Sequence, residues 1–114
     1  MSEQNRPKER RLHPRFVVEG KVELAGGPEG PALLRDLSMS GFSCVSPVAY
    51  DDMTVLEISM KLPQGDESRP FKAGGAVVRC EPCDEGGHLI AVFFTQMDAN
   101  NSQVLAEFIE HQAS

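Results

Sequence analysis

The sequence predicts a mainly β fold, a six-stranded antiparallel barrel with one C-terminal α-helix packed against it. Three observations support this fold class. Apolar and polar residues alternate through several short segments, glycine and proline clusters separate these segments, and the last segment has helical periodicity instead. A chain of 114 residues is long enough for one modest core. Short strands followed by one amphipathic helix are typical of a small barrel with a covering helix.

The first half of the chain contains three predicted strands. In the first, from Phe16 to Leu24, Val18 and Val22 share one face while charged residues occupy the other. Residues 25–30 are rich in glycine and proline and are predicted to form a turn. The second and third strands are predicted at 32–37 and 42–45, with a turn at 38–41 between them.

Three further strands are predicted in the second half of the chain. Residues 55–62 alternate again, 63–68 are expected to form a loop, and 71–80 form a longer strand that Gly74 and Gly75 interrupt with a bulge or bend. After a turn at 81–87, the last strand spans 88–94 and is apolar on both faces. We therefore expect the C-terminal segment to cover its outer side.

The C-terminal segment, about residues 99–112, is predicted to be that helix. Asp98 or Asn101 can cap its N-terminus, because short polar side chains accept hydrogen bonds from the first free backbone N–H groups. Its apolar stripe consists of Val104, Leu105, Phe108 and Ile109. We thus expect a flexible arm at residues 1–9 and one domain at 10–114, with the barrel at about 16–95.

The charge distribution restricts the class of ligand. The net charge is −6, yet residues 1–15 hold five basic and two acidic side chains, which leaves −9 on the remainder. An acidic body repels polyanions, so binding to a nucleic acid polymer is not expected, whereas a small anion held by the basic segment is allowed. No apolar run is long enough to insert into a membrane, and the odd count of three cysteines fits a reducing compartment. We expect a soluble, cytoplasmic protein.

Two short motifs carry the chemistry. Arg11 and Arg15 stand four apart before the first strand, and Asp36, Ser38 and Gly41 surround the turn between the second and third strands. A guanidinium group offers a planar set of donors that fits phosphate oxygens and the O6/N7 edge of guanine. Carboxylate and hydroxyl groups can accept the N–H donors of a base. Pro14 disfavours helix at His13, so the arginines are expected in a loop.

An R-x-x-x-R element followed by D-x-S-x-x-G, on this pattern of strands, resembles the PilZ domain family. The resemblance implies the same barrel and helix, and a bacterial receptor for the second messenger cyclic di-GMP that takes part in motility or biofilm regulation. Gly41 is expected to adopt a backbone conformation closed to other residues, which lets the turn approach the ligand. Ala91 departs from the family pattern, where glycine is common. The resemblance implies a cyclic di-GMP site formed by Arg11, Arg15, Asp36, Ser38 and Gly41, and Arg10 is a further candidate.

Two alternatives remain open. The first is a PilZ-like adaptor that binds proteins without any nucleotide. The second is a zinc or thiol protein that uses Cys80 and Cys83, with His88 and Cys44 as further candidate ligands. A second close pair of metal ligands is missing, and Cys44 alternates with Phe42 as a core residue would.

No metal, other cofactor or catalytic residue is expected, because the sequence lacks a nucleophile elbow, a phosphate-binding glycine loop and a pair of catalytic carboxylates. The expected protein is a receptor and not an enzyme. Binding of cyclic di-GMP would change the conformation of the N-terminal arm, and an effector protein would receive the signal through the barrel surface or through the helix around Val104 to Ile109.

Overall fold

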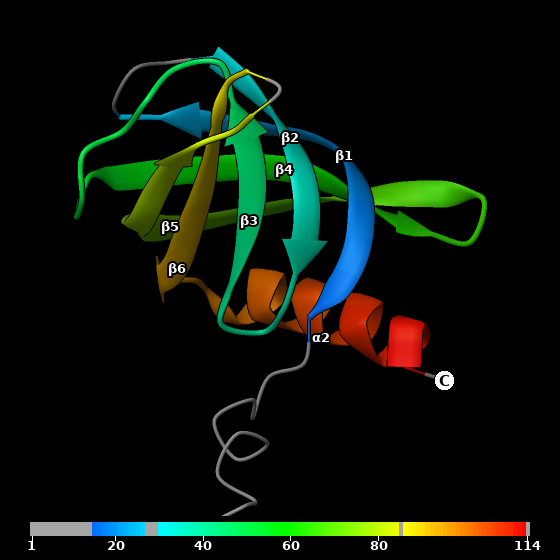
Figure 1. Cartoon of the computed structure of the whole chain (residues 1–114). Helices are drawn as coiled ribbons and strands as arrows, with labels where there is room; N and C mark the ends of the chain where they lie inside the picture. The colour runs from blue at the N-terminus through cyan, green and yellow to red at the C-terminus, as the bar shows by residue number, and fades with distance from the viewer. Residues whose placement is uncertain (1–14, 27–29, 85, 114) are drawn as a thin grey trace, which may run out of the picture.

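The computed structural model describes residues 15–26, 30–84 and 86–113. Six antiparallel strands close into one barrel in the order β1-β2-β3-β6-β5-β4, and a helix follows them (Figure 1), which confirms the predicted fold class. The predicted arm at residues 1–9, Arg10 and Arg11 lie outside the described residues. The elements are β1 (Phe16–Ala25), β2 (Gly30–Leu37), β3 (Gly41–Ser46), β4 (Val55–Gln64), β5 (Glu67–Pro82), β6 (His88–Gln96) and α2 (Ala99–Ala113).

Two meanders, β1-β2-β3 and β4-β5-β6, make up the barrel, and two contacts between them close it. Strand β3 pairs with β6 along its whole length, from Gly41 with Phe93 to Ser46 with His88. Strand β1 pairs with β4 over only four residues, from Val22 with Met60 to Ala25 with Glu57. We call this short closure the β1–β4 seam. Residues of β1 that precede Val22 do not pair with β4, and there the two strands diverge.

The hairpin between β4 and β5 differs from the prediction. A loop was expected at residues 63–68, but the paired strands continue to Gln64 and Glu67, so that expectation is wrong. Only Gly65 and Asp66 remain for the turn, and Gly65 has a φ of 62°, which glycine adopts at no steric cost. Pairing with the neighbouring strand therefore overrode the polar, proline-containing composition that suggested a loop.

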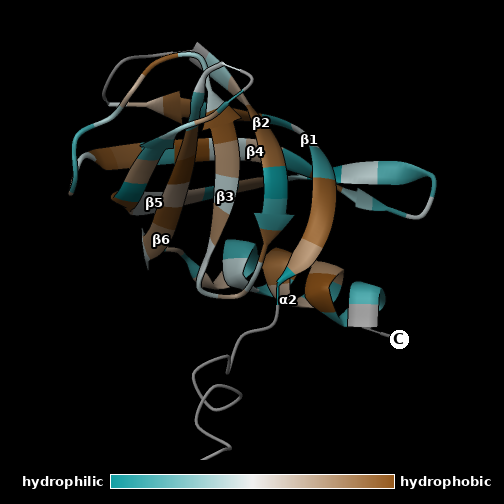
Figure 2. Ribbon diagram, in the orientation of Figure 1, coloured by the Kyte–Doolittle hydropathy of each residue, from teal (hydrophilic) through white to brown (hydrophobic). Residues whose placement is uncertain are grey.

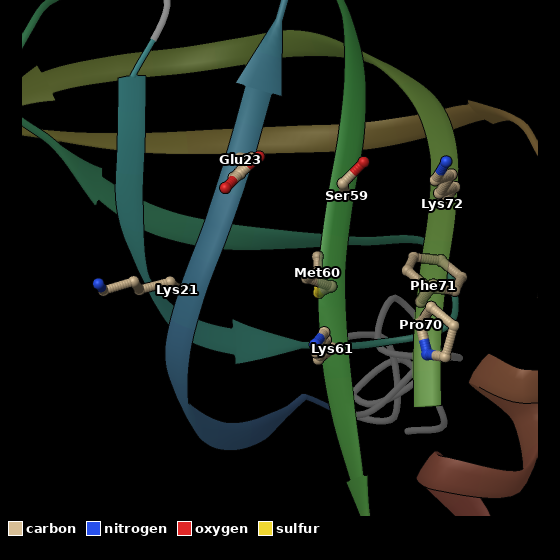
Figure 3. Close-up of a pocket in the computed structure, with 8 residues that line it drawn as sticks. All are labelled: Lys21, Glu23, Ser59, Met60, Lys61, Pro70, Phe71 and Lys72. Atoms are coloured by element: carbon tan, nitrogen blue, oxygen red, sulfur yellow. The ribbon is translucent and has the colours of Figure 1, made fainter. Parts of the chain in front are cut away.

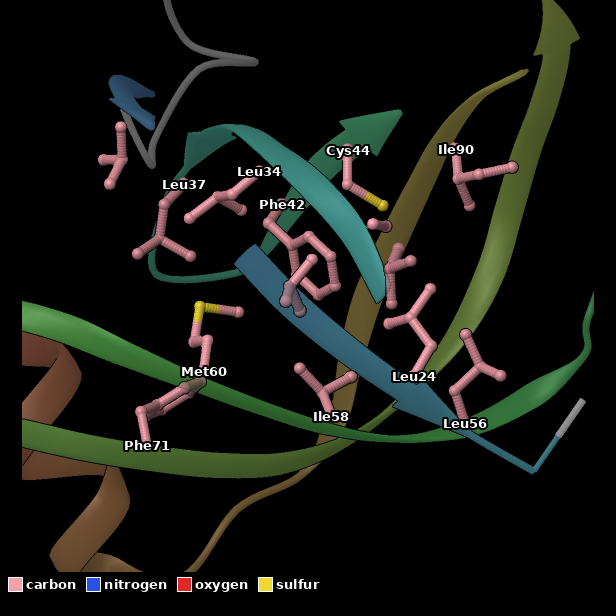
Figure 4. Close-up of a cluster of buried hydrophobic side chains, with 14 of the residues drawn as sticks. Leu24, Leu34, Leu37, Phe42, Cys44, Leu56, Ile58, Met60, Phe71 and Ile90 are labelled. Carbon is pink, nitrogen blue, oxygen red and sulfur yellow. The ribbon is translucent and has the colours of Figure 1, made fainter. Parts of the chain in front are cut away.

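Side chains that alternate along the strands fill the barrel (Figure 4), and the ribbon shows the same alternation of apolar and polar positions (Figure 2). Phe94 packs on Phe42 and Phe71, with ring centroids 5.8 and 5.6 Å apart. The predicted irregularity in β5 is confirmed, because its register with β6 shifts between Gly74 and Gly75. The largest fully buried side chains are Phe42, Phe71, Leu37, Leu56, Ile58, Leu62, Ile90 and Leu105.

Helix α2 packs against β4 and β5 at one end of the barrel (Figure 1). Asp98 is its N-cap, because its carboxylate accepts a 2.8 Å hydrogen bond from the backbone N–H of Asn101. The predicted cover over β6 is wrong, since Phe93 on the outer side of that strand stays 51% exposed. The predicted stripe instead faces the barrel, with Val104, Leu105 and Phe108 buried. Ile109, the fourth residue of the stripe, is half-buried, and the polar face of α2 is left to solvent.

Candidate functional site

Arg15 and Asp36 come together on the outer surface of the barrel. Antiparallel pairing of Phe16 with Leu37 and of Val17 with Asp36 brings the start of β1 beside the end of β2. Arg15 Nη1 donates a hydrogen bond of 2.6 Å to Asp36 Oδ1, and the two side chains are 44% and 30% exposed. One residue from each sequence motif thus meets in space, on the same side of the barrel.

This ion pair is accessible and weakly held. An exposed pair of this kind contributes between 0 and about 1 kcal/mol to stability, because water screens both charges. The guanidinium has several N–H donors, and only one of them bonds to Asp36 in the described structure. An incoming anion can therefore engage Arg15 at a small loss of existing interactions.

Ser38 lies at the turn between β2 and β3, and its hydroxyl is occupied by that turn. The side chain is fully buried, donates to the carbonyl of Gly41 at 3.2 Å, and accepts the N–H groups of Ser40 and Gly41 at 3.2 and 3.3 Å. The hydroxyls of Ser38 and Ser40 are also 3.2 Å apart. In this conformation Ser38 fixes the shape of the turn that joins β2 to β3.

Gly41 is required for a different reason from the one the sequence suggested. The expectation of a conformation closed to other residues is wrong, because the described glycines with positive φ do not include Gly41. The constraint is space, since a Cβ at this position would lie 2.1 Å from the carbonyl oxygen of Val92. Glycine here lets β3 approach β6 closely.

The strand order places further residues in line with Asp36, which the sequence alone did not indicate. Pairing runs from Asp36 on β2 to Ser43 on β3, from Ser43 to Ala91 on β6, and from Ala91 to Arg79 on β5. Ser43 and Ala91 each lie between two core residues of their own strand, so the middle of this row faces outward. Three strand spacings separate Asp36 from Arg79, about 14 Å. Small side chains thus lie between two arginine-bearing ends, Arg15 beside Asp36 and Arg79.

The sequence did not indicate that Arg79 and Phe93 lie near the motif residues, as the strand pairing shows. Arg79 forms a 3.3 Å ion pair with Glu81 on its own strand, and its side chain is 65% exposed. Phe93 pairs with Gly41 in the β3–β6 ladder, and it presents its exposed ring beside the turn that holds Ser38. A linear motif search could not find either residue, because both become neighbours of the motif only when β6 inserts between β3 and β5.

The thiols do not assemble into a metal centre within the described part of the chain. All three cysteines are free, and no group of three or more histidine, cysteine or carboxylate side chains there could hold a metal ion. Cys44 is a core residue, as predicted, and burial raises the pKa of its thiol to about 12. Cys80 and Cys83 are half-buried at the end of β5 and just after it.

No helix among the described residues combines the length and apolarity needed to cross a lipid bilayer.

A groove of about 550 Å³ lies on the barrel, but β1, β4 and β5 line it, and it includes none of the motif residues. The Arg15–Asp36 pair and this groove are therefore separate features of the surface.

Comparison with known proteins identifies the fold. The Bacillus subtilis inhibitor of motility MotI/DgrA superposes with a TM-score of 0.80 at 16% identity, over 90% of this chain and 51% of its own. The Borreliella burgdorferi PlzA protein in complex with c-di-GMP gives 0.63 at 13% identity, over 95% and 44%. Escherichia coli YcgR in complex with c-di-GMP gives 0.59 at 14%, over 90% and 45%.

The chain spans about half the length of these solved structures. No functionally curated protein matches its sequence. The PilZ domain family matches residues 9–111, which is nearly the whole chain, and this protein therefore belongs to the PilZ domain family.

Proposed function

We propose that this protein is a receptor for cyclic di-GMP and that it passes the signal to a partner protein. The observation that supports this most directly is the convergence of Arg15 and Asp36 at 2.6 Å on an exposed face. Membership of the PilZ family, and the c-di-GMP complexes of two proteins with the same fold, agree with it.

The chemistry of the ligand matches the outward row. Cyclic di-GMP carries two singly charged phosphates and two guanines, so it needs cations, acceptors for the guanine N–H groups, and flat surfaces. Arg15 supplies a cation and Asp36 an acceptor. The small side chains of Ser43 and Ala91, between Asp36 and Arg79, leave space for the ligand above the sheet. Arg10 and Arg11 would approach from the segment before β1, and Ser38 and Gly41 would act by shaping the turn.

The Ala91 side chain adds a methyl group to this floor. The family pattern more often has glycine there, so a guanine base of the ligand would lie slightly farther from β6 in this protein. Half-burial of Ala91 between Ser43 and Arg79 shows that the methyl group is already part of the outer surface. The proposed site therefore keeps its polar ends and is shallower at its centre.

Isothermal titration calorimetry with cyclic di-GMP tests the proposal. Loss of one charge-assisted hydrogen bond costs about 1.5–3 kcal/mol, so Arg15→Ala should weaken binding roughly 10- to 150-fold. Arg35→Ala is the matched control, because Arg35 is also an exposed arginine, lies in β2, and forms no ion pair with another described residue.

Three results would decide against the receptor. These are absence of heat with wild-type protein at tens of micromolar, equal affinity of Arg15→Ala and wild type, or equal affinity for GTP and cyclic di-GMP. If cyclic di-GMP does bind, tryptic cleavage after Arg10 and Arg11 should slow in its presence, because the arm would then become ordered against the ligand.

A further inference from the structure

A groove crosses the outer face of the barrel where β1 and β4 diverge (Figure 3). It has a volume of about 550 Å³ and combines basic residues with an apolar floor. Met60 and Phe71 line the groove but are only 6% and 0% exposed, so its accessible apolar surface belongs mainly to Pro70 and to the aliphatic stems of the lysines. We call this feature the lysine groove, and it is lined by Lys21, Glu23, Ser59, Met60, Lys61, Pro70, Phe71 and Lys72.

The groove follows from the shortness of the β1–β4 seam. The next pair after Val22 and Met60 would be Lys21 with Lys61, but no pairing is found there. From that point, β1 at residues 16–21 and β4 at residues 61–64 share no ladder. Helix α2 lies beside residues 62–64, so the groove opens on the side of Lys21 and Lys61. Backbone N–H and C=O groups on open strand edges can pair with an added strand.

The charge of the groove is opposite to that of the protein. Three lysines and one glutamate line it, whereas the chain as a whole carries −6. All three lysines are exposed, and none of them forms an ion pair with another described residue. Lys61 and Lys72 extend from neighbouring strands on the same outer face, so their charges add along the groove.

We propose that the lysine groove binds an extended acidic segment of a partner protein. The apolar floor accepts alternate side chains of an extended peptide, the open strand edges accept its backbone, and the lysines attract its carboxylates. The N-terminal segment of this chain is an unsuitable occupant, because its net charge of +3 would be repelled by the lysines. A long nucleic acid would meet the acidic remainder of the surface on either side.

An NMR titration of ¹⁵N-labelled protein tests this proposal independently of the nucleotide. The probe is a blocked peptide of alternating glutamate and valine, eight residues long, and the matched control is the same peptide with lysine in place of glutamate. The glutamate peptide should shift the backbone amides of residues 16–21 and of Lys61, Leu62 and Gln64 in a saturable way. The lysine peptide should leave them unchanged.

Charge reversal sharpens the test. The double variant Lys61→Glu with Lys72→Glu should weaken binding of the glutamate peptide about tenfold or more, because two attractive contacts become repulsive. Arg35→Glu reverses an exposed charge that does not line the groove and should leave the affinity as it is. Both residues of the double variant are exposed, so the fold should persist, and an unchanged pattern of core amide signals would verify this.

Several outcomes would overturn the proposal. If the glutamate peptide shifts no groove amide up to millimolar concentration, the lysines serve only to prevent the open strand edges from pairing with other chains. Equal shifts from inorganic phosphate would indicate a small-anion site instead. Binding to vesicles that contain phosphatidylglycerol, lost in the double variant and without any effect of the peptide, would indicate a membrane surface.

Discussion

Gly41→Ala should destabilise the barrel strongly, because the added Cβ has no space. The methyl carbon would lie 2.1 Å from the Val92 carbonyl oxygen, while unstrained contacts are near 3.5 Å. Strands β3 and β6 would have to separate by about 1 Å or more, at the end of the ladder that joins the two meanders. Overpacking costs about 1–3 kcal/mol, and a contact between backbone atoms belongs at the upper end of that range.

Urea denaturation followed by circular dichroism measures this loss. We expect the free energy of unfolding to fall by about 3 kcal/mol, with an unchanged m-value. Gly65→Ala is the control, because a Cβ there meets open space and suffers only from the φ of 62°. It should lose about 1 kcal/mol, as expected for a residue other than glycine in a left-handed turn.

The result that refutes the steric explanation is a Gly41→Ala variant as stable as the Gly65→Ala control. A normal stability with lost affinity for cyclic di-GMP would assign Gly41 to the ligand contact and not to strand packing. The two roles, which the sequence motif cannot separate, would then be separated by one variant.

Three further predictions concern other parts of the molecule. Leu105→Ala removes a fully buried side chain between α2 and the barrel, so urea denaturation should show a loss of about 2–5 kcal/mol, and a loss below 1 kcal/mol would mean that α2 packs loosely. The Cys44 thiol, whose pKa is raised to about 12, should react with a thiol reagent only after unfolding, and its labelling in the native state, located by mass spectrometry, would contradict the packed core. Hydrogen bonds from the first turn of α2 lower the pKa of Asp98 from 3.8. The contribution of the ionised carboxylate to the stability of the fold is therefore complete above pH 3.8 and is lost as the pH falls through the lower pKa of the folded state. Asp98→Asn keeps the cap but does not titrate, so its thermal midpoint should decline less than that of wild type on acidification, and parallel declines would show that the carboxylate charge is irrelevant.

The strands and the helix could be predicted because their signals are local. Val18 and Val22, or Val104 and Phe108, show their periodicity within a few residues, and the structure buries all four. The two errors in the elements depend on contacts between elements, which no single segment of the sequence shows. Gln64 and Glu67 look like loop residues until the strands behind them align, and the apolar outer side of β6 gives no indication that Phe93 stays exposed.

The candidate site was only partly predictable for the same reason. The convergence of Arg15 with Asp36 could be expected, because a hairpin between consecutive strands brings its two ends together. Arg79 and Phe93 could not be placed beside the motif, because their positions depend on β6 lying between β3 and β5. The role of Gly41 was misjudged because the sequence shows that a side chain is absent but not which atom would contact one.

The hairpin of β4 and β5 has a practical consequence. Its tip, from Gln64 to Ser68, is exposed, and Figure 1 places it away from the turn between β2 and β3. Exposed tips of this kind tolerate inserted or attached groups. A cysteine at Asp66, in a background where Cys80 and Cys83 are serine, would therefore carry a fluorescent dye or a surface tether. Such a reporter would leave both the proposed nucleotide site and the core unlabelled.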